Sequence, residues 1–339
     1  MAHTSRAVVF SFLGVTVPLL TGGCAREASR PSERVVAFRY TASLTGLPAQ
    51  ASPVRLWIPL AKTRENQRVL SRRIEVARPY EIHEEPVFGN DILYLALTPP
   101  LPRPFSVVID YEVALRRGRR LAPRPLVHVF GGVASADDVA TALRNEPLMV
   151  VDETVTRLAR GVTESRTTNL QKARAIYDYV IAHMRYDKTT PGWGRGDTLR
   201  ACALGKGNCT DFHSLFISMG RAVGLPARFV IGVSLPREPA GEIPGYHCWA
   251  EFYSPRQGWV PVDASEAWKH PDLRDYYFGT RDENRVSISV GRNIRLVPAQ
   301  AGAPVNIFVY PYAEVDGLPG GVIETRFQFR DRNTREART

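Results

Sequence analysis

The sequence predicts an α+β protein, in which a strand-rich N-terminal region is followed by a region that mixes helices and strands. Residues 107–115 alternate apolar and polar side chains, and the runs 54–60 and 91–97 have the same strand-like character. Residues 169–184 instead repeat apolar side chains at the spacing of an amphipathic helix. Strand-like segments within 246–263 flank a turn that contains Pro and Gly. We therefore expect a β-sandwich first and a mixed domain after it.

The length of the chain, 339 residues, exceeds that of an average domain and favours two domains with additional segments. Hydrophobic residues make up 44% and charged residues 23%, both near the averages of folded domains, so neither a disordered chain nor a fibrous repeat is expected. The expected segments are a signal peptide (1–23), a linker (24–34), a β-sandwich domain (35–130), the mixed domain (135–300) and a β-prone C-terminal extension (301–339).

The N-terminus has the features of a signal peptide. A short basic start precedes an apolar run, 7–20, that is too short to span a membrane comfortably. Gly22 and Gly23 before Cys24 resemble the site at which bacterial lipoprotein signals are cleaved and the new N-terminal cysteine is lipidated. Thr21 departs from this pattern, which most often has Leu there, so cleavage as an ordinary secreted protein is the alternative. We expect an exported protein, either a periplasmic or outer-envelope lipoprotein that meets the membrane only through Cys24, or a secreted one.

The formal net charge of +10 raises the question of an anionic partner. The densest basic run contains Arg116, Arg117, Arg119, Arg120 and Arg124, but it lacks interleaved aromatic residues and any nucleic-acid-binding motif. We interpret this run as a solvated linker, and export also argues against a nucleic-acid partner.

Two helices are expected in the second region. The first, 169–184, follows Thr168, which with Gln171 has the pattern of a capping box. The second begins at Cys209, because apolar residues recur behind it at helical spacing until a Gly-Leu-Pro turn at 224–226.

Cys209 therefore lies at a helix N-terminus. Unpaired backbone N–H groups and the positive end of the helix dipole favour a thiolate there, which is the form that a nucleophilic cysteine needs. Gly205 and Gly207 allow the backbone to approach a substrate closely, and the N–H of Cys209 is the natural first donor of an oxyanion hole. A structural thiol fits this local sequence equally well, so the downstream residues decide.

The segment 246–263 is expected to form a hairpin of two strands. If Tyr253 pairs with Trp259, His247 and Asp263 become diagonal neighbours on one face, with Cα atoms roughly 7–8 Å apart. A carboxylate at that place can accept the imidazole N–H and orient a base for the thiol, so the three residues have the composition of a catalytic triad. A slip of one residue would send them to opposite faces.

Other residues compete for these roles. His213 lies four residues after Cys209 on the same helix, but it has no obvious orienting carboxylate. Asp211 is expected to complement the helix dipole, and Glu251 lies farther from His247 than Asp263 does. Candidates for a second oxyanion donor or for a wall of the cleft are Asn208, Trp193, Tyr186 and Trp249.

Four cysteines are present. If Cys24 is lipidated and Cys209 stays a reactive thiol, Cys202 and Cys248 remain for a disulfide, which an exported compartment permits. Equally, both can be small buried side chains beside the site. No metal site is expected, because the chain has no CxxC or HxxxH spacing, and no cofactor is expected either.

Four segments in this order resemble the transglutaminase-like superfamily. They are Gly207–Cys209 opening a helix, the turn Gly224–Arg228 ending it, the strand segment His247–Trp249, and the segment Gly258–Asp263. The resemblance covers residues 169–268. One departure is Cys248, which stands where a small residue is more frequent; it leaves the triad intact and leaves room for redox control.

This resemblance implies a papain-like core, in which a helix that carries the cysteine packs on an antiparallel sheet that carries the histidine and the aspartate. Members of the superfamily include protein cross-linkers, peptidases, amidases and inactive relatives, so fold alone does not give the substrate. We expect acyl transfer from an amide of a peptide or protein through a thioester, with water as the acceptor. Transglutaminase cross-linking and an inactive binding or scaffolding lipoprotein are the alternatives, and the sequence predicts no oligomeric state.

Overall fold

The structure is a computed structural model that describes residues 33–46, 53–98, 100–102, 104–119, 121 and 134–332. The predicted signal peptide, Cys24 and the basic residues Arg120 and Arg124 lie outside the described residues. No helix within the described ranges is both long and apolar enough to cross a membrane.

Two five-stranded sheets form the sandwich, and their inner faces share one hydrophobic core. The first sheet has the order β11 (Ala240–Ile243), β18 (Ile323–Asp331), β1 (Glu33–Leu44), β6 (Phe105–Arg116) and β3 (Gln67–Glu75). The second has the order β17 (Leu318–Pro319), β16 (Tyr312–Val315), β2 (Val54–Leu60), β5 (Asp91–Leu97) and β4 (Glu81–Glu84).

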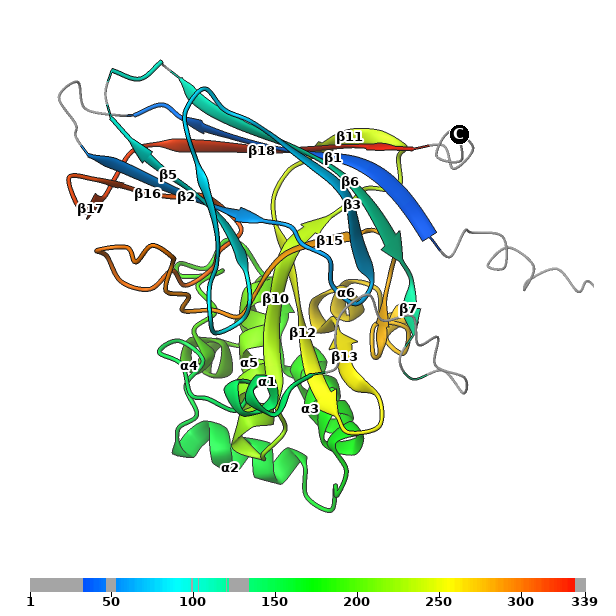
Figure 1. Cartoon of the computed structure of the whole chain (residues 1–339). Coiled ribbons are helices and arrows are strands. Elements are labelled where there is room, and N and C mark those ends of the chain that lie inside the picture. The colour runs from blue at the N-terminus through cyan, green and yellow to red at the C-terminus, as the bar shows by residue number, and fades with distance from the viewer. Residues whose placement is uncertain are drawn as a thin grey trace, which may run out of the picture. The chain divides into compact units, whose positions relative to one another are not determined.

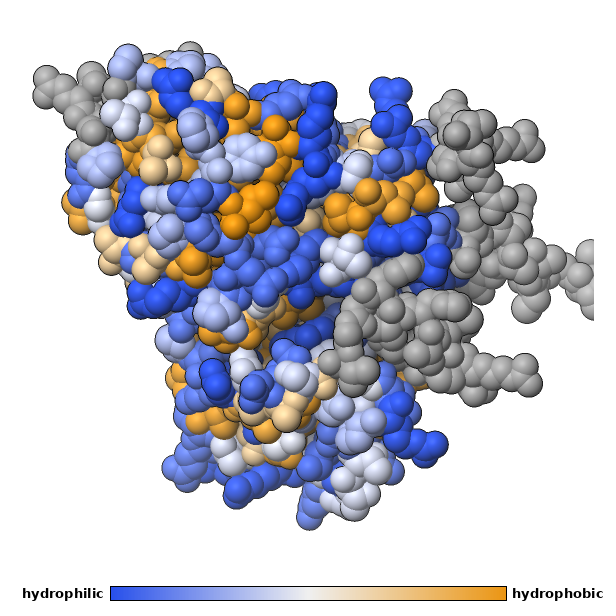
Figure 2. Space-filling view, in the orientation of Figure 1, coloured by the Kyte–Doolittle hydropathy of each residue, from blue (hydrophilic) through white to orange (hydrophobic). Residues whose placement is uncertain are grey.

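The alternation predicted for 107–115 is confirmed in β6, where Val107, Ile109 and Tyr111 are buried while Asp110 between them is not. Figure 2 shows hydrophobic residues on the surface of this region as well, interspersed with hydrophilic ones. Scattered apolar side chains of this kind are common on folded proteins and require no partner. The large exposed ones in the sandwich strands or the turns next to them are Leu70, Tyr80, Ile82, Val87, Leu318 and Val322.

The C-terminal segment contributes strands to both sheets. Strand β18 pairs antiparallel with β1 along its whole length, and Figure 1 shows the red strand beside the blue one. Strand β16 pairs with β2 in the second sheet. The sequence within 301–339 thus shares the sandwich with strands from 35–130, which no local pattern predicts. The domain boundaries given above stay a prediction.

The second region is built on a four-stranded antiparallel sheet with the order β13 (Gly258–Val262), β12 (His247–Ser254), β10 (Ala227–Ser234) and β15 (Arg285–Val290). Its helices are α1 (Ala136–Thr141), α2 (Glu153–Val162), α3 (Asn169–His183), α4 (Thr198–Leu204), α5 (Cys209–Ala222) and α6 (Ala264–Lys269), with a short 3-10 turn at Pro271–Leu273. Two short strand pairs join β7 (Gly118–Arg119) with β14 (Thr280–Arg281), and β8 (Arg185–Tyr186) with β9 (Lys206–Gly207).

Helix α3 confirms the predicted capping box, because the Thr168 side chain accepts from the N–H of Gln171 and the Gln171 side chain accepts from the N–H of Thr168. Helix α5 is the centre of the region. It packs on β12 and β10 on one side and on α2, α3 and α4 on the others, as Figure 1 shows. Every residue from Cys209 to Arg221 is therefore buried, where the sequence predicted a single apolar stripe.

The fold class is the predicted one: a helix that carries a cysteine packs on an antiparallel sheet, after a β-sandwich. Burial explains why α5 holds its place. Phe212, Leu215 and Phe216 are fully buried, and each such side chain stabilises the fold by about 1.5–3 kcal/mol relative to an exposed one. The first residue of this helix is thereby fixed against β12, which begins with His247.

Candidate active site

Cys209 is the first residue of α5 and is 2% exposed. The helix begins with a capping box: the Asn208 side chain accepts from the N–H of Thr210 at 2.9 Å, and the Asp211 carboxylate accepts from the N–H of Asn208 at 2.9 Å. The cap fixes the start of the helix, so the thiol stays at the positive end of the helix dipole, as the sequence predicts.

Asp211 does more than complement the helix dipole. Its carboxylate also accepts from the N–H groups of Gly194, at 2.7 Å, and Gly196, at 3.0 Å, in the loop before α4. A Cβ on Gly207 would lie 2.2 Å from Oδ2 of this carboxylate, so only glycine fits there. The glycine predicted to let a substrate approach therefore makes room for the anchor of the neighbouring loop.

Tyr246 connects the strand of His247 to the helix of Cys209. Its hydroxyl accepts from the Asn208 amide at 2.8 Å and lies 3.0 Å from the Thr210 hydroxyl. No role was expected for this tyrosine from the sequence, although it stands directly before His247. These contacts hold the start of β12 against the first turn of α5.

The hairpin has the predicted register, because Tyr253 pairs with Trp259. Strand β13 ends at Val262, and the next residue, Asp263, is the N-cap of α6. His247 Nε2 lies 2.7 Å from Asp263 Oδ2, with 8% of His247 and 2% of Asp263 exposed. The imidazole N–H thus donates to a buried carboxylate, as a base that needs orientation requires.

Cys209 and His247 change each other's pKa. Hydrogen bonding by Cys248 lowers the pKa of the Cys209 thiol; burial opposes this, but hydrogen bonding and positive charge from His247 add to it, and the pKa lies well below its usual range. Burial lowers the pKa of His247, but the charge and hydrogen bond of Asp263 outweigh it and raise the pKa to about 9. Both shifts favour a thiolate on Cys209 beside an imidazolium on His247.

Asp263 is held at both oxygens. Oδ1 accepts from the Ser265 hydroxyl at 2.8 Å and from the N–H of Glu266 at 2.9 Å, while Oδ2 accepts from His247 and from Arg285 Nη1 at 2.5 Å. Burial raises the pKa of this carboxyl, but the charges of Arg285 and His247 hold it well below its usual range. Neither Ser265 nor Arg285 was found from the sequence.

His213, the alternative base, is fully buried and already engaged. Its Nε2 accepts from the N–H of Ala264 at 3.1 Å and lies 3.5 Å from Asp263 Oδ1. Because Nε2 accepts from a backbone N–H, the neutral ring carries its proton on Nδ1, so neither nitrogen is free to take a proton from a thiol. Burial also lowers the pKa of this histidine. Glu251, the other alternative, forms an ion pair with Arg228 at 2.6 Å.

The candidates for the cleft fall in different places. Tyr186 pairs with Gly207 next to the cap of α5, and its ring lies 4.1 Å below the Lys269 ammonium. Trp193 is 38% exposed, in the loop that Asp211 anchors. Trp249 is 1% exposed and stacks on the His247 ring at 6.4 Å, so it supports the histidine from within. The amide of Asn208 is used by Tyr246, as described above.

Cys202, Cys209 and Cys248 are free thiols, so the structure does not contain the disulfide that the sequence offered as one of two alternatives. Cys248 is buried 3.8 Å from both the Thr210 hydroxyl and Nδ1 of His213, whereas Cys202 is partly exposed on α4. Among the residues that the structure describes, no three His, Cys, Asp or Glu side chains are grouped to hold a metal ion.

The chain is similar to several known proteins. An uncharacterised protein of Haemophilus influenzae is 33% identical over 318 residues, which cover 83% of this chain and 86% of that protein. YebA of Bacillus subtilis, also uncharacterised, is 27% identical over 134 residues, or 35% of this chain and 18% of that protein. The crystal structure of a candidate cysteine protease from Cytophaga hutchinsonii shares the fold, with a TM-score of 0.57 at 19% identity over 89% of this chain and 91% of that one.

Residues 156–264, which include Cys209, His247 and Asp263, match the sequence profile of the transglutaminase-like superfamily. Members of this superfamily are typically cysteine enzymes. The chain belongs to the transglutaminase-like superfamily.

Proposed function

We propose that the protein hydrolyses an amide bond of a peptide or protein through a thioester on Cys209, as a peptidase or amidase. The observation that supports this most strongly is the grouping of three buried residues: Cys209 at the start of α5, His247 at the start of β12, and Asp263, which accepts from His247 at 2.7 Å. An unreactive scaffold has no need of a thiol with a lowered pKa beside a histidine with a raised one.

The chemistry follows from the protonation states. The Cys209 thiolate attacks the amide carbonyl carbon, and the N–H of Cys209 stabilises the oxyanion that forms. The His247 imidazolium donates its proton to the leaving amine, so the C–N bond breaks and a thioester remains. His247 then takes a proton from water, whose oxygen attacks the thioester, and the thiolate is released with the acid product. Asp263 orients His247 and stabilises its charge throughout.

The N-terminal sequence supports a cellular location for this activity. We infer from the signal-peptide pattern that the protein is exported, and from Gly22, Gly23 and Cys24 that a lipid attaches it to the envelope. Mass analysis of the mature N-terminus tests the anchor: a diacylglycerol-modified Cys24 is expected, and an unmodified chain cleaved elsewhere would leave only secretion.

Alkylation by iodoacetamide tests the activated thiol, with Cys202 of the same chain as the internal reference. Burial raises the pKa of Cys202, so below neutral pH we expect Cys209 to react much faster than Cys202. His247→Ala should remove that advantage. If Cys209 reacts no faster than Cys202 in the wild-type protein, the enzyme proposal is wrong and an inactive binding protein becomes the better description.

An experiment that traps the acyl-enzyme and identifies its products shows whether water or an amine is the acyl acceptor. Peptide libraries are incubated with the protein in 18O-labelled water, with and without a primary amine, and both the acyl-enzyme and the products are analysed by mass. Hydrolysis predicts one 18O atom in the acid product even when the amine is present. Transfer to the amine in preference to water would instead identify a transglutaminase.

A further inference from the structure

A second cation, Arg285, contacts the same oxygen of Asp263 that His247 contacts. Arg285 is the first residue of β15 and pairs with Ser234 of β10, so it enters the site from the edge strand of the sheet. Its side chain is 4% exposed, compared with 2% for that of Asp263. The contact is therefore a buried, charged hydrogen bond, of the kind that fixes geometry most strongly.

The guanidinium of Arg285 is itself fixed by neighbours on two sides. Nε lies 3.4 Å from Oδ2 of Asp282, and Cζ lies 5.5 Å from the centre of the Trp249 ring. The same indole also stacks against the ring of His247, with 6.4 Å between the ring centres. Arg285 thus touches the carboxylate that orients the histidine and the indole that supports it.

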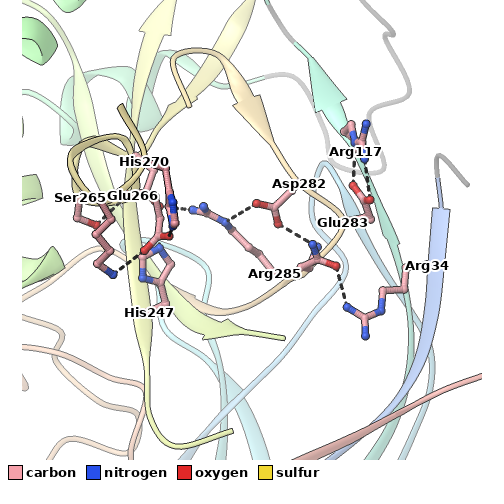
Figure 3. A network of polar contacts seen from close by, with 12 residues as sticks. Arg34, Arg117, His247, Ser265, Glu266, His270, Asp282, Glu283 and Arg285 are labelled. Atoms are coloured by element: carbon pink, nitrogen blue, oxygen red, sulfur yellow. Dashed lines mark hydrogen bonds and ion pairs between the residues drawn. The ribbon is translucent and has the colours of Figure 1, made fainter. Parts of the chain in front are cut away.

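The turn before Arg285 is held by the sandwich. Glu283 forms two hydrogen bonds of 2.8 Å with Arg117, and Asn284 accepts from Arg34 of β1 at 2.7 Å. Figure 3 shows Arg117 meeting Glu283 beside Asp282, while Arg285 extends from there toward the side of His247. Contacts from the sandwich therefore set the position from which Arg285 reaches Asp263.

We propose that Arg285 is a positioning residue for the acyl transfer, and this rests on the function proposed above. The guanidinium holds the Asp263 carboxylate in the rotamer and charge state from which it orients His247, and Arg34 and Arg117 hold the two residues before Arg285. Arg285 does not meet the substrate, because its buried side chain has the carboxylate between it and the imidazole. Its loss should change the rate of the chemical step and the titration of the thiol, and leave substrate binding alone.

Arg285→Gln tests the proposal through two measurements. A peptide substrate found by the trapping experiment should show kcat reduced roughly 10- to 100-fold with KM unchanged, since small displacements of a catalytic group have effects of this size. The pH below which Cys209 alkylation slows should rise by about one unit or more. Without Arg285 the Asp263 carboxylate takes up a proton at higher pH, and it then no longer stabilises the imidazolium that favours the thiolate. Arg285→Lys keeps the positive charge but lacks the planar set of guanidinium donors. It should restore the pH dependence of Cys209 alkylation and only part of kcat.

Arg221→Gln is the matched control, because Arg221 is equally buried, forms an ion pair with Glu146 at 2.9 Å and lies at the far end of α5. Arg221→Gln should lower the free energy of unfolding without changing the pH dependence of Cys209 alkylation. If Arg285→Gln folds and has the wild-type kcat and the wild-type pH dependence of Cys209 alkylation, the role of Arg285 is disproved. The proposed hydrolytic function is not affected by that result. If Arg285→Gln does not fold, wild-type kcat in Arg285→Lys has the same meaning. Slow alkylation of Cys209 in the wild-type protein would instead remove the proposed function itself.

Discussion

Substituting His247 with glutamine should remove a part of the stability that depends on pH. In the folded protein His247 is protonated against the cost of burial, because Asp263 supplies a charge and a hydrogen bond. Glutamine has a similar length and can still donate an N–H to the carboxylate, but it carries no charge. Arg285 continues to neutralise Asp263 in the variant, so the substitution removes the titration without leaving a buried charge alone.

The size and sign of the effect follow from the pKa of His247, which rises from 6.5 in the unfolded chain to about 9 in the folded protein. A raised pKa means that the folded state binds the proton more tightly than the unfolded state. The stabilisation is therefore complete below about pH 6.5 and is lost as the pH rises through about 9. At about 1.4 kcal/mol per pKa unit, this change corresponds to about 3 kcal/mol in the free energy of unfolding.

Urea unfolding of both proteins at a series of pH values from about 6 to 10 measures this quantity. Both proteins carry Cys209→Ala, because the Cys209 thiol also titrates in this range and its pKa depends on His247. Lysines and tyrosines titrate alike in both proteins, so the difference between the two free energies then isolates His247. We expect that difference to fall by up to about 3 kcal/mol across the series, because Asp263 makes the largest contributions to the raised pKa. A difference that stays constant within about 0.5 kcal/mol would contradict this prediction, because His247 would then not be held protonated by Asp263.

Three further substitutions test the surroundings of Cys209. Cys248→Ala removes a hydrogen bond to Cys209 and should raise the pKa of that thiol, so alkylation below neutral pH should slow about tenfold for each pKa unit; an unchanged rate would contradict the contact. Gly207→Ala forces a Cβ to within 2.2 Å of the Asp211 carboxylate and should cost about 1–3 kcal/mol of stability in urea unfolding, whereas wild-type stability would show that the loop can yield. Tyr246→Phe loses two hydroxyl contacts at the start of α5, so we expect a loss of about 1 kcal/mol and a lower kcat/KM; equal values for both proteins would disprove that link.

The start of α5 and the register of the hairpin were predictable because each depends on residues that lie close together in the sequence. An apolar repeat ended by a glycine turn gives α5 and places Cys209 at its start, and the structure confirms both. A hairpin with a short turn has few registers that keep its apolar face buried, so the pairing of Tyr253 with Trp259 could be derived as well. In each case the residues that determine the geometry lie within one helix or one hairpin.

What the sequence did not predict depends on pairing across long separations. Arg285 reaches Asp263 only because β15 lies beside β10, and β10 lies beside β12, an order that no local pattern gives. For the same reason the pairing of β18 with β1 could not be predicted, although both lie in regions that the sequence predicted to be rich in strands. His213 was ambiguous in the sequence, because spacing on a helix shows proximity to Cys209 but not that Ala264 already occupies its nitrogen.

The geometry of the site depends on the sandwich through two separate connections. The segment that leads into β12, and hence into His247, includes β11, which pairs with β18 at the edge of the first sandwich sheet. The segment that leads into β15, and hence into Arg285, is held by hydrogen bonds from Arg34 and Arg117. Because the histidine and the arginine meet at the carboxylate of Asp263, a displacement of either connection changes the distances there. No residue of the proposed triad lies in the described strands of the sandwich, yet these strands hold the segments that lead to His247 and to Arg285.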